Sequence, residues 1–134
     1  MAFRAPTLTA VLGTSAAIPP ELLAAFPELY AIRLRRGGLA PRLGGWCLGQ
    51  RCVAGITFGR WVWLAPDVVA TAELLLHEVR HVHQFQALRG FPLRYVWESL
   101  RRGYLNNRYE VDARRYVAWR LTGAATGLTP REDG

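Results

Sequence analysis

The sequence contains no lysine, and this absence bears on the meaning of its positive charge. All 17 basic residues are arginine, against 10 acidic residues, which gives a net charge of +7. Arginine suits the recognition of phosphates and carboxylates, because its planar guanidinium donates hydrogen bonds in pairs. The arginines are scattered, however, and the only tight groups are Arg33-Arg35-Arg36, Arg101-Arg102 and Arg114-Arg115. A nucleic-acid-binding surface should concentrate its charge on one face, so we do not expect a nucleic-acid partner.

Long hydrophobic runs are also missing. No stretch of 18 apolar residues occurs, so no segment is predicted to cross a membrane as a helix. The most apolar window near the start, residues 7–18, is interrupted by threonine, glycine and serine. It is poorer in leucine than the hydrophobic part of a signal peptide. We therefore expect a cytoplasmic protein with no membrane partner.

Cysteine is scarce, with only Cys47 and Cys52 in the chain. Two cysteines cannot form a zinc site alone, and their spacing differs from the CxxC redox motif. If Gly49-Gln50 formed a hairpin turn, the two thiols would face each other and could bond. In a reducing cytoplasm we expect free thiols.

What is present predicts one folded domain over residues 1–134, since 51% of the 134 residues are hydrophobic. Between residues 30 and 64, glycines separate short runs rich in Trp, Val, Ile and Phe. This pattern predicts three or four short antiparallel strands. The clearest are 53–58 and 60–64, with Gly59 as a turn or bulge between them.

After Pro66 the hydrophobic pattern becomes helical. Asp67 is a suitable N-cap, and Gly90, Gly103 and Gly123 are suitable stops. We expect helices at residues 21–26, 67–88, 93–102 and 108–121, with irregular arms at residues 1–18 and 124–134. The predicted class is α+β, with a small twisted antiparallel or mixed sheet packed on a central helix that two further helices follow.

All three histidines, His77, His81 and His83, fall within seven residues of this central helix. Positions i and i+4 share one helix face, so His77 and His81 can bind one ion together. Glu78 lies about 100° around the axis, from where it can reach a water on that ion without being a ligand. This is the HExxH arrangement of metal-dependent hydrolases. A pair of unbound histidines on an ordinary helix is the simpler alternative, but buried imidazoles without partners would be costly.

A third protein ligand is needed, and no histidine follows the motif. The carboxylates of Glu98, Glu110 and Asp112 are the candidates. We favour Glu110, with Asp112 next. Glu110 has an alternative role, because Asn107-x-x-Glu110 resembles a capping box in which the glutamate bonds the Asn107 amide.

The segment from His77 to Gln84, with the later Tyr109-Glu110-Val111-Asp112-Ala113, resembles the small gluzincin-type zinc metallopeptidases, including minimal one-domain forms. Residues 55–62 resemble the strand pair that precedes the active-site helix in that clan. The resemblance covers residues 53–118 and implies a zincin-like fold. It implies zinc ligands His77, His81 and Glu110, with Glu78 as general base. Many gluzincins have an acidic residue four positions after the glutamate ligand; here it is Arg114, so Asp112 or Asn107 would have to support a histidine.

The resulting hypothesis is a zinc metallopeptidase acting on a peptide or protein, as a monomer or weak homodimer. The peptide would add along the strand edge within residues 53–64. Tyr104 is our preferred donor to the oxyanion, with Tyr109, Tyr116 and His83 as alternatives. So small a domain favours slow or self-inhibited activity. The other hypotheses are a zinc enzyme for a small amide or cell-wall peptide, a zinc-holding module without turnover, and an arginine-rich nucleic-acid binder.

Overall fold

The structure, a computed structural model, describes residues 7–41 and 54–122. The chain divides into two compact units, Met1–Ala70 and Thr71–Gly134. Helices and a mixed sheet are both present, which confirms the α+β class. Cys47, Cys52 and the expected arm at residues 124–134 lie outside the described residues, and the expectation of one domain stays a prediction.

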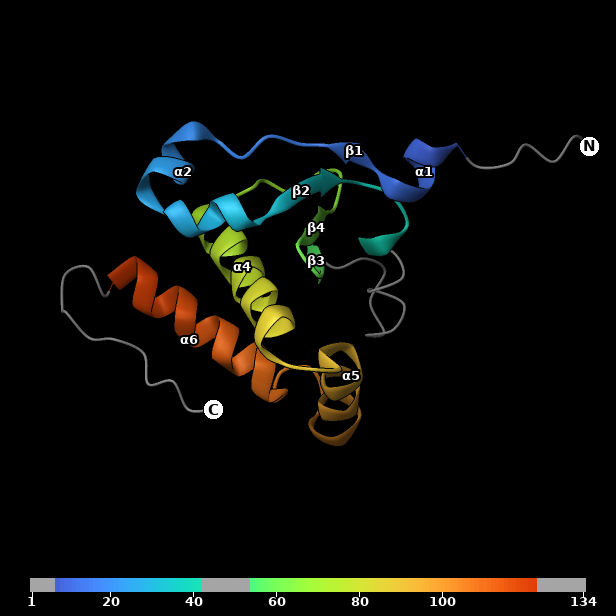
Figure 1. The fold of residues 1–134 in the computed structure, drawn as a ribbon, viewed down its shortest axis with the longest axis vertical. Helices are drawn as coiled ribbons and strands as arrows, with labels where there is room; N and C mark the ends of the chain where they lie inside the picture. Colours follow the sequence, from blue (N-terminus) through green and yellow to red (C-terminus); the bar gives the residue numbers. More distant parts are fainter. Residues whose placement is uncertain (1–6, 42–53, 123–134) are drawn as a thin grey trace, which may run out of the picture. The chain divides into compact units, whose positions relative to one another are not determined.

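The first unit is built around a four-stranded sheet (Figure 1). Its elements in chain order are α1 (Leu8–Leu12), β1 (Thr14–Ser15), α2 (Pro20–Ala25), the 3-10 helix η1 (Pro27–Ala31), β2 (Arg33–Arg36), β3 (Gly55–Phe58) and β4 (Trp61–Leu64). The helix expected at residues 21–26 is thus confirmed as α2. Apolar side chains of η1, β2 and β4 are buried, among them Leu29, Leu34, Val62 and Leu64.

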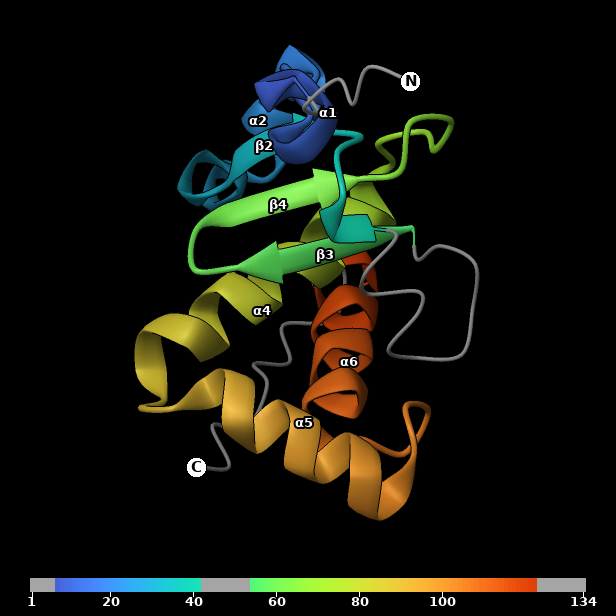
Figure 2. The same cartoon turned by 90° about the vertical axis from the view of Figure 1, so that its right-hand side faces the viewer.

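The strand order is β1-β2-β4-β3. Strands β3 and β4 are antiparallel neighbours (Figure 2), as the sequence predicts. The turn between them contains Gly59 with φ of +63°, a conformation that glycine adopts without strain. Strands β2 and β4, however, are parallel. The sheet is therefore mixed, one of the two expected alternatives, and the antiparallel pairing expected within residues 30–64 is wrong for this pair of strands. A tight turn forces antiparallel pairing, whereas the long connection between β2 and β4 leaves the direction open.

The expectation of an irregular arm at residues 1–18 is wrong for residues 8–15. Thr7 caps α1 by accepting a hydrogen bond from the amide of Ala10, and β1 pairs with β2. The carbonyl of Leu12 accepts hydrogen bonds from Trp63 Nε1 at 3.0 Å and from Arg35 Nε at 2.7 Å. These bonds attach the segment to the sheet, and they join residues too distant in sequence to be found by periodicity.

The second unit consists of three helices in its described part, α4 (Ala72–Ala87), α5 (Phe91–Arg102) and α6 (Arg108–Thr122). The helices expected at residues 93–102 and 108–121 are confirmed as α5 and α6. The central helix begins later than expected, because its N-cap is Thr71 rather than Asp67. The Thr71 hydroxyl accepts a hydrogen bond from the Leu74 amide at 3.2 Å, whereas Asp67 lies in a preceding turn.

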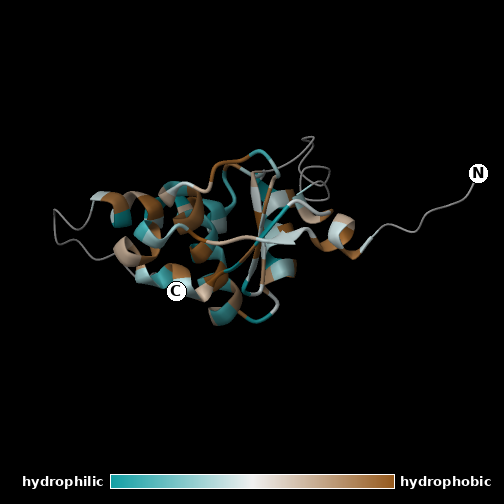
Figure 3. Ribbon diagram, turned by 90° about the horizontal axis from the view of Figure 1, so that it is seen from above, coloured by the Kyte–Doolittle hydropathy of each residue, from teal (hydrophilic) through white to brown (hydrophobic). Residues whose placement is uncertain are grey.

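Helices α4 and α6 pack against each other, and α5 contacts α4. Hydrophobic and hydrophilic residues alternate along the helices (Figure 3). The buried ring of Phe91 contacts rings from all three helices. Its centroid is 4.7 Å from that of Phe85, 5.9 Å from that of Tyr95 and 5.0 Å from that of Tyr109. This aromatic cluster holds α4, α5 and α6 together, and so helps to position the polar side chains that these helices carry. In the described part of the chain, no helix has both the length and the apolar composition needed to cross a bilayer.

Candidate metal centre

Helix α4 presents His77 and His81 on one face. The two residues are one turn apart, and their Nε2 atoms lie 3.2 Å from each other. On the opposite side of the helix Leu75, Val79 and Val82 are buried. Burial of that apolar face fixes the rotation of α4 about its axis, and this in turn determines where both imidazoles point.

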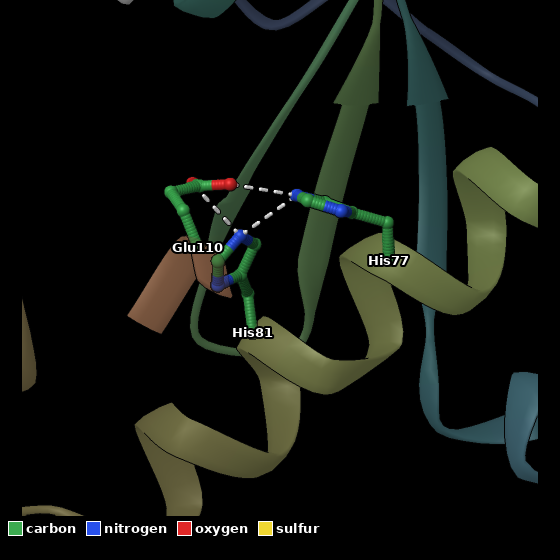
Figure 4. A group of neighbouring side chains, drawn as sticks. All are labelled: His77, His81 and Glu110. Carbon is green, nitrogen blue, oxygen red and sulfur yellow. Dashed lines mark hydrogen bonds and ion pairs between the residues drawn. The ribbon is translucent and has the colours of Figure 1, made fainter. Parts of the chain in front are cut away.

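Glu110, in the first turn of α6, supplies the third side chain (Figure 4). It follows His77 by 33 residues in the chain. Its Oε2 is 2.9 Å from His77 Nε2, and its Oε1 is 3.1 Å from His81 Nε2. The packing of α4 against α6 therefore brings together the three residues that the sequence suggested as ligands.

These three side chains could hold one metal ion. In a tetrahedral site with nitrogen and oxygen ligands at about 2.0–2.1 Å, the ligand atoms are about 3.3 Å apart. The two Nε2 atoms are 3.2 Å apart, and they contact different oxygens of Glu110, Oε2 at 2.9 Å from His77 and Oε1 at 3.1 Å from His81. With one ligand atom from each residue, all three atoms lie within 4.8 Å of one another, so the side chains would have to adjust to bind an ion at tetrahedral spacing. The donor set of two imidazoles and one carboxylate suits zinc and also other first-row transition metals.

The site has a marked charge complementarity. Burial alone would raise the pKa of Glu110, but hydrogen bonds from His77 and His81 and the charges of these residues hold it well below its usual range. Burial alone would lower the pKa of His81. The hydrogen bond to Glu110, the charges of Glu78 and Glu110 and the hydrogen bond to Gln84 instead raise it to about 9. An ion entering this site would therefore take the place of a proton on His81.

Gln84 orients His81. Its Nε2 donates hydrogen bonds to the carbonyl of Tyr109 at 3.1 Å and to Asp112 Oδ2 at 2.8 Å. Its Oε1 is then left to accept a bond from Nδ1–H of His81, 2.7 Å away. This arrangement puts a proton on Nδ1 and directs Nε2 toward the ligand cluster. Sequence reasoning quoted Gln84 without giving it a role, and its position three residues after His81 is the signal that could have found it.

Asp112, the alternative ligand, is engaged elsewhere. It pairs with Arg80, whose Nε lies 2.7 Å from Oδ2 and whose Nη2 lies 3.2 Å from Oδ1. Its contact with Gln84 makes it an indirect support of His81. Arg114, where many gluzincins have an acidic residue, donates to the carbonyl of Leu105. The hydrogen-bonded support expected from Asp112 therefore reaches the histidine through Gln84.

Asn107 caps α6 without help from Glu110. Its Oδ1 accepts a hydrogen bond from the Tyr109 amide at 2.9 Å, and its own amide donates to the carbonyl of Tyr104. The capping-box alternative for Glu110 is thus wrong, because the Glu110 carboxylate lies with the histidines. Asn107 Nδ2 also donates to the carbonyl of Tyr95 and to Ser99 Oγ, which fastens α5 to the start of α6.

Two tyrosines lie beside the ligand cluster. The hydroxyl of Tyr95 donates to Glu110 Oε1 at 2.7 Å, a contact that sequence reasoning missed. Burial raises the pKa of Tyr104 to about 12, with further contributions from the charges of Glu110 and Glu78 and from a hydrogen bond to Glu110. Tyr104 and the buried Glu78 are therefore both close enough to the cluster to interact with it electrostatically.

The remaining candidates lie apart from the cluster. Glu98 is buried on α5 and its Oε2 is 3.5 Å from Arg102 Nε, so it is not grouped with the histidines. His83 stacks edge-on against Tyr116, and Tyr109 packs on Phe91.

No family model matches this chain, and neither a curated protein nor a solved structure does. The gluzincin resemblance therefore stays a prediction.

Proposed function

We propose that this protein is a zinc-dependent metallopeptidase in which His77, His81 and Glu110 bind the metal. One observation carries the proposal: His77 Nε2 and His81 Nε2 lie 3.2 Å apart, and each lies within 3.1 Å of one of the two Glu110 carboxylate oxygens. The orientation of His81 by Gln84 supports it further, because ligand histidines commonly use their second ring nitrogen in this way. A cytoplasmic location and a monomer or weak homodimer remain part of the proposal, based on the sequence alone.

A bound zinc ion would lower the pKa of a water molecule and polarise the substrate carbonyl. Glu78 would accept a proton from the attacking water and later deliver it to the leaving amine. Its burial next to His77 and its charge influence on His81 and Tyr104 support this role. Tyr104, which lies close enough to Glu110 and Glu78 for their charges to raise its pKa, would donate its hydroxyl hydrogen to the developing oxyanion.

The ligand assignment is tested by metal analysis of the zinc-loaded protein after extensive buffer exchange. We expect the parent to retain stoichiometric zinc and both His81→Ala and Glu110→Ala to lose it. Glu73→Gln is the control, because Glu73 is exposed in the first turn of the same helix. Absence of zinc from the loaded parent would defeat the proposal, and retention by Glu110→Ala would move the third ligand elsewhere.

The catalytic assignment is tested with Glu78→Gln and a mixture of fluorescence-quenched peptides. This variant should keep its zinc and lose hydrolysis by about 10²- to 10⁴-fold, the usual contribution of a general base. Glu73→Gln again serves as the control. Loss of zinc in Glu78→Gln would mean that Glu78 has a structural role.

A zinc-holding module without turnover is the second candidate. The same group of His77, His81 and Glu110 would hold the ion in such a module, so turnover alone separates the two candidates. Stoichiometric zinc in a parent that cleaves no peptide would select this candidate.

A further inference from the structure

Helix α5 has its polar side facing inward. Tyr95 donates to Glu110, and Ser99 accepts a hydrogen bond from Asn107. Glu98 is only 6% exposed, although it carries a charge. Apart from Phe91, the inward face is thus made of groups that usually face water.

The outward face of α5 is apolar. Leu93 is 79% exposed, Val96 53%, Trp97 63% and Leu100 79%. These four residues occupy positions i, i+3, i+4 and i+7, so they form one continuous stripe along the helix. Single exposed apolar residues are common on proteins, whereas a contiguous stripe indicates an interaction surface.

The charges around this stripe are of one sign. Arg94 and Arg101 lie on the helix beside the stripe, and Arg89 precedes the helix; all three are exposed. Arg102, the last residue of the helix, lies on the other side, where its Nε is 3.5 Å from Glu98 Oε2. The one acidic residue of the helix, Glu98, is buried on the other side. Pairing of the stripe with a second copy of itself would bring these arginine-bordered surfaces together and cause repulsion. The partner that fits is both apolar and negatively charged.

We propose that α5 docks on the surface of an anionic phospholipid bilayer. Leu93, Val96, Trp97 and Leu100 would enter the interfacial layer, where tryptophan is favoured, and the arginines would contact lipid phosphates. The expectation of no membrane partner followed from the absence of a spanning segment, a criterion that does not detect a helix lying on the surface. The proposal is independent of the metal site, because none of the stripe residues is a ligand.

The test is cosedimentation of the full chain with two kinds of vesicle, phosphatidylcholine alone and phosphatidylcholine mixed with phosphatidylglycerol. We expect binding to the mixed vesicles and weak binding to the neutral ones. Leu100→Gln should weaken binding by at least about tenfold, because one leucine contributes that much when it leaves water. Leu8→Gln is the matched control, since Leu8 is 77% exposed on α1, and it should bind as the parent does.

A second pair of variants tests the charge. Arg101→Gln should weaken binding to the mixed vesicles by about fivefold, because a basic residue near an anionic surface contributes about 1 kcal/mol. Arg115→Gln, on the exposed side of α6, is the control and should bind the mixed vesicles as the parent does. Added salt should weaken binding of the parent.

Three results would overturn the proposal. They are an absence of binding to the mixed vesicles, equal binding of the parent and Leu100→Gln, and a dimer of the parent that Leu100→Gln dissociates. Zinc content, measured on the same samples, keeps these outcomes separate from any failure of the metal site.

Discussion

Gln84 is the side chain through which the surrounding structure orients His81, and Gln84→Met removes this connection while keeping the length of the side chain. The lost contacts are the 2.7 Å bond to His81 Nδ1 and the bonds to Asp112 and to the Tyr109 carbonyl. His81 then has no acceptor that holds its proton on Nδ1, so its Nε2 is less often available to an ion.

The expected size follows from two considerations. Removing an outer partner of a metal-ligating histidine lowers metal affinity by about 10- to 100-fold, which corresponds to about 1.4–2.7 kcal/mol. An unpaired buried donor costs about 1–3 kcal/mol in the metal-free protein as well. The free energy lost with the Gln84 bonds is therefore partly the same in the metal-free and the zinc-bound protein. We expect zinc affinity to fall by about tenfold, the lower end of the 10- to 100-fold range, and thermal stability to fall as well.

The assay is a zinc titration of the metal-free protein in competition with a chromophoric chelator, after circular dichroism has shown that the helices are intact. Gln86→Met is the matched control, because Gln86 is exposed on the same helix. A folded Gln84→Met protein that binds zinc as tightly as the parent would refute the role that we give to Gln84.

Three further predictions concern single groups. Burial alone would raise the pKa of Asp112, but its bonds to Arg80 and Gln84 lower that pKa from 3.8. The stabilisation that the ionised Asp112 provides is therefore fully present above pH 3.8. It is lost as the pH falls through the lowered pKa. Asp112→Asn should accordingly lower the free energy of unfolding at pH 7 by about 1 kcal/mol, discounted because the pair is partly exposed. In urea unfolding, the difference from the parent should shrink as the pH falls through the lowered pKa of Asp112. Because His81 has a pKa of about 9, its proton must leave when zinc binds, so the apparent Kd should fall by about tenfold per pH unit between pH 7 and 9; a flat profile would contradict this. Tyr104→Phe should keep zinc and lower kcat by about 10²- to 10³-fold with little change in KM, and an unchanged kcat would remove Tyr104 from the reaction.

Local sequence was enough to predict the elements that carry the site. The spacing of His77 and His81 places both on one helix face whatever the rest of the chain does, because it follows from helical geometry. From the glycines and capping residues, the ends of helices 91–102 and 108–122 were predicted to within two residues of where they lie in the structure. The start of α4 was missed because Asp67 and Thr71 are both good caps, and local chemistry does not choose between them.

Tertiary structure decided everything that depends on contacts distant in sequence. Glu110, Glu98 and Asp112 were all plausible ligands from sequence, and only the packing of α4 against α6 brings Glu110 to the histidines. The parallel pairing of β2 with β4 and the attachment of residues 8–15 to the sheet are long-range in the same sense.

Helix α5 is the clearest case of this division. Its sequence fixes a stripe of Leu93, Val96, Trp97 and Leu100 at helical spacing, and periodicity alone would assign such a stripe to the core. In the fold the stripe is exposed, because Tyr95 and Ser99 are held inward by Glu110 and Asn107. Helical periodicity tells which residues share a face, whereas the direction of that face depends on what the other helices offer to bind.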